Sequence, residues 1–149
     1  MNEQITGKCK MIGINHVALE VGDIDDALDF YGRFFDFTLR GRSDKMAFID
    51  MGDQFIALAA TDQLTTDRHR HFGLVVDDRS HLKERLKAEQ IELIPGKGLN
   101  FHDPWGNYIQ VVEYRDIQFS KTEAALRGMN LKLDKTEEAL GQLRDKGMR

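Results

Sequence analysis

Two histidines occupy equivalent places in two similar stretches of the chain, and their spacing is the most direct sign of chemistry in the sequence. His16 opens the run His-Val-Ala-Leu-Glu-Val-Gly-Asp and His71 opens the run His-Phe-Gly-Leu-Val-Val-Asp-Asp, so an Asp follows seven residues after each histidine. If both runs are strands of repeated units, a pseudo-twofold arrangement brings both imidazoles to one cup. Neutral imidazoles are common ligands of divalent metals. The pattern therefore predicts a metal site, while a histidine packed in the core is the alternative for each position.

Repeated elements would position these histidines. We expect a strand over 12–21, a helix over 24–35 and three short strands over 38–42, 46–50 and 54–59. The same order restarts 55 residues after His16, with a strand from His71, a helix over 79–90, a strand near 91–94, a Gly-rich link over 95–98 and a hairpin. This self-similarity predicts two β-α-β-β-β units that share one core. Chance resemblance between two amphipathic β-α units is the alternative.

The hairpin carries a third candidate. Asp103-Pro104-Trp105-Gly106 has Pro where a turn needs a preset φ and Gly where it needs a positive φ, and an alternating apolar run follows. Alternation along that strand places Gln110 on one face and Glu113 on the other. Only a bulge between them would bring Glu113 to the face of Gln110.

Composition narrows the class of protein. The 149 residues are 41% hydrophobic, which suits one compact domain. The formal net charge of −4 offers no basic field for phosphate backbones or anionic lipid, which argues against nucleic acid and membrane partners. No apolar run approaches the roughly 18 residues of a membrane span, and the N-terminus lacks the apolar centre of a signal peptide. We expect a soluble, cytoplasmic protein. The single Cys9 excludes an internal disulfide.

Three segments together resemble a known family: Asn15 to Leu19 with the helix residues Leu28 to Tyr31, the run His71 to Asp78, and Asp103 to Asn107. They resemble the vicinal oxygen chelate (VOC) superfamily of glyoxalase I, fosfomycin- and bleomycin-resistance proteins, extradiol dioxygenases and methylmalonyl-CoA epimerase. The resemblance covers about residues 12–114. It implies an α+β fold in which two βαβββ modules, about 12–60 and 70–115, form a curved mixed sheet around a small-molecule site. We expect one domain over 1–116 and a C-terminal helical extension over 117–149.

The resemblance also implies a ligand set. In metal-using members the ligands come from the first and last strand of each module, and these positions fall on His16, His71 and Gln110, with the non-coordinating Ala57 at the fourth. Gln110 stands where a glutamate is usual, so a divalent metal is possible but the charge of the ion is uncompensated. We therefore expect a protein that binds a small organic molecule in the cup, with a weak or degraded metal site. The alternative is an active metalloenzyme of lyase, isomerase or dioxygenase type.

Further residues could line the cup or build a partner surface. His69, Glu20, His102 and Trp105 are candidates for substrate binding. In the tail, Ser120-Lys121-Thr122-Glu123 and Asp134-Lys135-Thr136-Glu137 resemble capping boxes and predict two short helices. The second helix has an apolar stripe of Ala139, Leu140 and Leu143, which must be buried on its own sheet or on a second subunit. We expect a homodimer.

Overall fold

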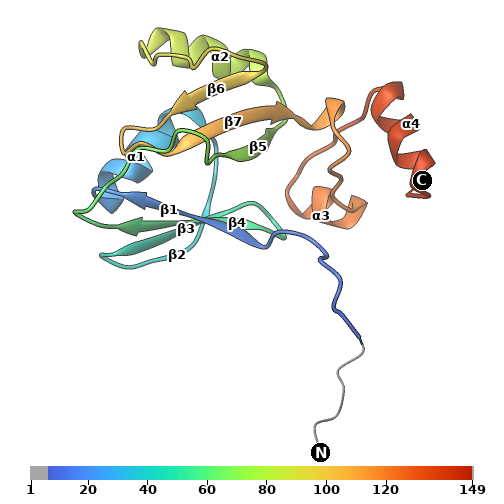
Figure 1. Ribbon diagram of the computed structural model, residues 1–149, viewed down its shortest axis with the longest axis horizontal. Coiled ribbons are helices and arrows are strands. Elements are labelled where there is room, and N and C mark those ends of the chain that lie inside the picture. Colours follow the sequence, from blue (N-terminus) through green and yellow to red (C-terminus); the bar gives the residue numbers. More distant parts are fainter. Residues whose placement is uncertain (1–6, 149) are drawn as a thin grey trace, which may run out of the picture.

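The computed structural model describes residues 7–148 and shows two modules, each with a sheet and a helix (Figure 1). The first module forms a four-stranded sheet in the order β1-β4-β3-β2, in which β1 runs parallel to β4 and the other pairs are antiparallel. Its elements are β1 His16–Val21, α1 Ile24–Phe34, β2 Leu39–Arg42, β3 Met46–Asp50 and β4 Phe55–Ala60.

The second module repeats this arrangement with one strand fewer. Its sheet has the order β5-β7-β6, and β5 again runs parallel to the last strand of the module. Its elements are β5 Phe72–Val76, α2 Arg79–Ala88, β6 Leu99–His102 and β7 Tyr108–Glu113. The predicted α+β fold of two repeated modules is confirmed. The first strand of each module, β1 or β5, is an edge of its sheet.

The matched aspartates of the two runs have the same structural role. Asp23 caps α1 by accepting a hydrogen bond from the backbone N–H of Asp26, and Asp78 caps α2 by accepting one from Ser80. A carboxylate at this position satisfies a free backbone donor and is favoured by the helix dipole. The seven-residue spacing from histidine to aspartate is therefore the length of one strand followed by its helix cap.

The segment 91–94 differs from the prediction. It is not a strand, because within it only Leu93 makes a β-bridge, to Phe101, and Ile94 donates its backbone N–H to the carbonyl oxygen of Asn100. Pro95 follows at once and has no N–H to continue a ladder. The predicted first strand is also shorter than expected, since β1 begins at His16 and not at residue 12.

One face of each sheet builds the core with the helices. The inward positions alternate along the strands, with Ile56 and Leu58 buried on β4 and Ile109 and Val111 buried on β7. They pack in one cluster with apolar residues of α1 and α2, such as Phe30. The opposite faces are left for His16, His71 and Gln110. Among residues 7–148, no helix combines the length and apolar character that crossing a membrane requires.

The C-terminal tail continues from β7 through the 3-10 turn η1 Tyr114–Asp116 to α3 Glu123–Gly128 and α4 Glu137–Asp145. Both predicted helices are confirmed, but their caps are Thr122 and Thr136, two residues later than the capping-box pattern placed them. Ala139 and Leu143 are buried against the tail's own chain, where α4 contacts η1. The apolar stripe is thus covered within one molecule.

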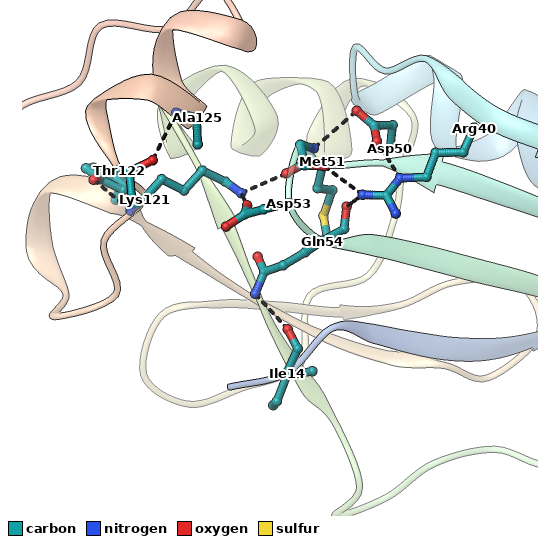
Figure 2. Close-up of polar contacts among 11 residues, drawn as sticks. Ile14, Arg40, Asp50, Met51, Asp53, Gln54, Lys121, Thr122 and Ala125 are labelled. Atoms are coloured by element: carbon teal, nitrogen blue, oxygen red, sulfur yellow. Dashed lines mark hydrogen bonds and ion pairs between the residues drawn. The ribbon is translucent and has the colours of Figure 1, made fainter. Parts of the chain in front are cut away.

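A lysine joins this tail to the first module. Lys121 pairs with the Asp53 carboxylate and donates to the carbonyl oxygen of Met51 at 2.7 Å, both in the turn between β3 and β4 (Figure 2). Its side chain is only 9% exposed. The sulfur of Met129 also lies against Gly52, so close that a Cβ there would be 2.6 Å away. The tail therefore leaves the second module and is fixed on the first.

Candidate functional site

Two of the three predicted ligands lie on one face of the second sheet. Gly73 of β5 is in register with Gln110 of β7, and His71 directly precedes β5 with its ring 5.2 Å from that of Tyr108. Gln110 is half-buried on the face opposite to its fully buried neighbours in sequence. The alternation predicted for this strand is thus observed. His71 and Gln110 are diagonal neighbours across two adjacent strands.

Gly73 leaves open space beside Gln110. A Cβ added at Gly73 would have no heavy atom within 4 Å, and the residue is exposed. Glycine is unfavourable in a strand because it has no side chain to pack. Here the missing side chain keeps the surface next to the Gln110 amide accessible to a ligand.

The tautomer of His71 follows from its hydrogen bond. Nδ1 of His71 is 2.8 Å from the carbonyl oxygen of His69, which can only accept. Nδ1 therefore carries the proton and Nε2 has a free lone pair when the ring is neutral. A backbone carbonyl in this place is a usual way to orient a ligating imidazole. His71 is thus prepared to bind a metal ion or to accept a hydrogen bond through Nε2.

His16 has the same local arrangement on the first sheet. Its Nδ1 is 2.8 Å from Oδ1 of Asn15, which leaves Nε2 as the free atom. The ring lies flat on Phe55, its partner in register, with centroids 4.6 Å apart and an angle of 11°. Arg40 is in β2, at the other edge of this sheet, and its guanidinium lies 4.7 Å from the centroid of the Phe55 ring. His16, Phe55 and Arg40 therefore form a stack of flat groups.

Arg40 is held by several acceptors at the same time. It pairs with Asp50 at 2.6 Å and donates to the carbonyl oxygens of Gly52 and Gln54 (Figure 2). The hydrogen bond from Arg40 lowers the pKa of Asp50 from its usual value. The guanidinium is thus fixed over Phe55 by its polar contacts.

The fourth ligand position holds a buried alanine, Ala57. Ala57 is 3% exposed and lies in register with Phe48 of β3 and Ala18 of β1. Its methyl group offers no donor atom. The first module therefore contributes one imidazole to any site, and the second contributes an imidazole and an amide.

Within one chain, His16 and His71 belong to different sheets that share no strand pairing. The part of the chain that the structure describes has no group of three or more His, Cys, Asp or Glu side chains placed to hold a metal ion. The predicted ligand set has only two residues of these four types, His16 and His71, because its third member, Gln110, is an amide. The structure thus places His71 with Gln110, and it places His16 with Phe55.

Two of the other candidates, His69 and His102, lie around His71. His69 is in the loop before β5, and its carbonyl oxygen orients His71. His102 donates Nε2–H to the carbonyl oxygen of Asp67 at 2.8 Å, and its ring meets Tyr108 edge-on at 5.4 Å. His71, Tyr108 and His102 therefore form a row of rings at one end of the second sheet.

Glu20 and Trp105 lie where the two modules meet. The carbonyl oxygen of Glu20 accepts a hydrogen bond from Nδ2 of Asn107, while its side chain is exposed. Trp105 packs edge-on against Phe30, with centroids 6.0 Å apart, and a Cβ at Gly22 would be 2.9 Å from its indole nitrogen. Both contacts connect the hairpin of the second module to the first module.

Glu113 points away from the face of Gln110, as predicted. Its Oε1 accepts a hydrogen bond from the backbone N–H of Arg79, the first residue of α2, at 2.8 Å. A carboxylate at a helix start has a stabilising role of its own. Glu113 is therefore no substitute for a ligand at position 110.

Sequence reasoning missed Asn100, the neighbour of Gln110 on its other side. Asn100 of β6 is in register with Gln110 and is 3% exposed. Its Nδ2 donates to the carbonyl oxygen of Lys97 at 2.8 Å, but its Oδ1 is buried and has no hydrogen-bond partner among the described residues. The hairpin closed by the Asp103 turn sets this register. Counting back from the turn could therefore have identified Asn100.

Comparison with known proteins adds a family match. The model of the glyoxalase/bleomycin resistance protein/dioxygenase superfamily matches residues 13–111. This range includes the first module, the second module as far as Val111 of β7, and every candidate metal ligand.

Solved structures with the same fold have low sequence identity to this chain. A glyoxalase family protein from Bacillus anthracis is 20% identical with a TM-score of 0.61, and the match covers 72% of this chain and 98% of that one. A genomically encoded fosfomycin resistance protein from Listeria monocytogenes is 18% identical with a TM-score of 0.58, covering 78% and 98%. A lactoylglutathione lyase from Agrobacterium tumefaciens is 22% identical with a TM-score of 0.58, covering 70% and 96%. At these identities the likeness shows a shared fold.

Proposed function

Since this chain belongs to the glyoxalase/bleomycin resistance protein/dioxygenase superfamily, we propose that it binds a small organic molecule on the face that carries His71 and Gln110, with a weak or degraded divalent-metal site. The observation that carries this proposal is the open space beside Gln110, where Gly73 has no side chain. Around it lie an imidazole with a free Nε2, an amide and the Tyr108 ring. Such a mixture of apolar surface and a few oriented polar groups is typical of small-molecule sites.

The donor atoms suit a metal ion in type but not in charge. His16 and His71 both have Nδ1 engaged and Nε2 free, and Gln110 could offer Oε1, so these three residues would hold a divalent ion. All three ligands are neutral, and Ala57 supplies none. Without a carboxylate the charge of the ion is not offset, which weakens its binding. A bound ion would supply Lewis-acid polarisation of neighbouring oxygens on the ligand.

We also propose a homodimer. The strand β1, which begins at His16, and the strand β5, which follows His71, are each an edge of their sheet. Edge strands present unpaired backbone groups that favour pairing with another chain. A mass measurement in solution at micromolar concentration tests this proposal, and a monomeric mass would contradict it.

Metal content is the first test of the site. Wild-type protein purified without chelator should hold less than one equivalent of divalent metal, and Gln110→Glu should hold more because it adds a negative charge. His71→Ala should remove the bound metal from both backgrounds. Stoichiometric metal in the wild type, lost in His16→Ala and His71→Ala, would favour the alternative of an active metalloenzyme. If neither the wild type nor Gln110→Glu binds metal, the metal part of the proposal fails.

Ligand binding is tested separately by calorimetry. Fosfomycin and bleomycin are rational probes because proteins of this fold and family are named for resistance to them. Each is titrated into metal-free and Co²⁺-loaded protein, and Gln110→Leu serves as the control that keeps volume but removes the polar atoms. If either probe gives a heat of binding with the wild type but not with Gln110→Leu, the result would support the proposed site. Equal heat in wild type and control would place binding elsewhere.

A further inference from the structure

A buried acceptor without a partner lies directly beside the proposed ligand atom. Oδ1 of Asn100 is enclosed by protein and accepts no hydrogen bond from the described residues. The orientation of the amide is set by its other end, because Nδ2 donates to the carbonyl oxygen of Lys97, which cannot donate in return. Rotating the amide would place two oxygen atoms against each other. The free atom is therefore the oxygen, and leaving it unsatisfied is costly.

The side chain in register with Asn100 carries a donor for this oxygen. Gln110 is the partner in register on β7, and side chains directly opposite each other have Cβ atoms about 4.5–5.5 Å apart. His102, next on the same face of β6, already donates Nε2–H to Asp67, so its Nδ1 is an acceptor when the ring is neutral. Gly73, beyond Gln110, has no side chain. The Nε2 group of Gln110 can therefore supply the missing hydrogen.

We propose that Asn100 is a positioning residue: when the Gln110 side chain rotates toward it from the arrangement in this structure, Oδ1 of Asn100 accepts a hydrogen bond from Nε2 of Gln110, and Oε1 of Gln110 faces Gly73 and His71. The role of this bond rests on the proposed function, because Oε1 is the atom proposed to meet the ligand. It also gives a reason for glutamine at this position. An ionised glutamate has no hydrogen to donate, so it would leave Asn100 unsatisfied and place two acceptors together.

The ionisation of an introduced carboxyl group measures this contact directly, without any metal or ligand. In Gln110→Glu the protonated carboxyl can donate to Asn100 while the ionised form is repelled. Its pKa should therefore lie at least about one pH unit above the ordinary value of about 4.3 for glutamate. Carboxyl ¹³C chemical shifts followed between about pH 3 and 8 give the titration midpoint. Adding Asn100→Ala should return the midpoint toward the ordinary value.

The neighbouring charges are the same in both variants. The imidazoles of His71 and His102 share this face of the sheet with position 110, and their effect on the carboxyl pKa is the same with or without Asn100. The difference between the single and double variants is therefore the signal. Val112→Glu, on the same face of β7 but outside the register of Asn100, is the matched control. Its midpoint should not respond to Asn100→Ala.

A second measurement uses wild-type protein and needs no folded Asn100→Ala variant. The side-chain Nε2 protons of Gln110 are assigned by their loss in Gln110→Glu. One of them should exchange with solvent at least about tenfold more slowly than those of the exposed Gln63. Equal exchange rates, or a carboxyl midpoint that ignores Asn100→Ala, would overturn the proposal. Failure of metal or probe binding would leave both results unchanged, so the two proposals fail separately.

Discussion

The hydroxyl of Tyr31 donates a 2.7 Å hydrogen bond to the carboxylate of Asp103, 72 residues away in the sequence. Both groups are buried, with 2% and 4% of each residue exposed. Asp103 also accepts from the backbone N–H groups of Trp105 and Asn107 and from Nδ2 of Asn107. Since Tyr31 is in α1 and Asp103 begins the hairpin, this contact connects the two modules. The buried charge is stabilised by several donors at once.

Removing this hydroxyl should weaken the folded state. Tyr31→Phe deletes a hydrogen bond to a charged acceptor inside the protein, and we expect the free energy of unfolding to fall by about 1.5–3 kcal/mol. Urea unfolding followed by the fluorescence of Trp105 gives the value. Tyr108→Phe is the control, because Tyr108 is half-buried on the open face of β7, and its change should stay within about 0.5 kcal/mol. Equal losses in both variants would contradict the assigned role of Tyr31.

The same contact predicts a response to alkaline pH. Burial, followed by the charge of Asp103 and the hydrogen bond to it, raises the pKa of Tyr31 well above its usual value of 10.0. Above about pH 10 the unfolded chain releases a proton that the folded chain keeps. The contribution of Tyr31 to stability is therefore complete below pH 10 and is lost as the pH rises toward its folded pKa. Unfolding curves between about pH 8 and 11 should converge for wild type and Tyr31→Phe. Parallel curves would count against this.

Filling the space at Gly73 should separate stability from binding. Gly73→Val adds a residue that favours strands where nothing obstructs it, so the free energy of unfolding should rise by about 0.5–1 kcal/mol. The added methyl groups occupy the surface beside Gln110, so Co²⁺ and probe binding should decrease. Gly41→Val is the matched control, because Gly41 is also a strand glycine with no atom near its Cβ position, on β2. Loss of binding in both variants would show that the space beside Gln110 is not the site.

Removing the Lys121 contacts should make the tail more accessible to protease. Lys121→Met removes the pairing with Asp53 and the hydrogen bond to Met51, and the lowered pKa of the Asp53 carboxyl, caused mainly by Lys121, should return toward normal. We expect thermolysin to cleave the region of α3 several-fold faster than in wild type. The control is Lys132→Met, at an exposed position of the tail, and thermolysin should cleave this variant at the wild-type rate. Unchanged cleavage in Lys121→Met would mean that other contacts hold the tail.

Local patterns predicted the elements well, and contacts across the fold were harder to foresee. The repeat identified His16 and His71 and the matched aspartates seven residues later, which the structure shows to be helix caps. Each of these signals lies within one β-α unit. The apolar run 91–94 was indistinguishable from a strand until its pairing was known, and Pro95 limits that pairing to one bridge.

Long-range pairing could not be read from the same signals. Tyr31 lies on the buried face of α1, and nothing local in the sequence indicates that its hydroxyl meets Asp103. Likewise, Phe55 under His16 and Asn100 beside Gln110 depend on strand register, which is set by the whole module. The repeat and the family resemblance therefore suggested candidate positions, which stay a prediction, while their surroundings could not be foreseen.

The contact of Lys121 with the turn between β3 and β4 gives the two modules a second connection through the chain, in addition to the linker between them. The modules are joined covalently by residues 61–71. They are also joined by the Tyr31–Asp103 hydrogen bond and by the tail, which starts at the second module and contacts the first through Lys121. A hinge needs one free connection, and the additional contacts between the modules resist bending. We therefore expect residues beyond the family match, which ends at 111, to set the angle between the sheets and so to lower the entropy lost on ligand binding.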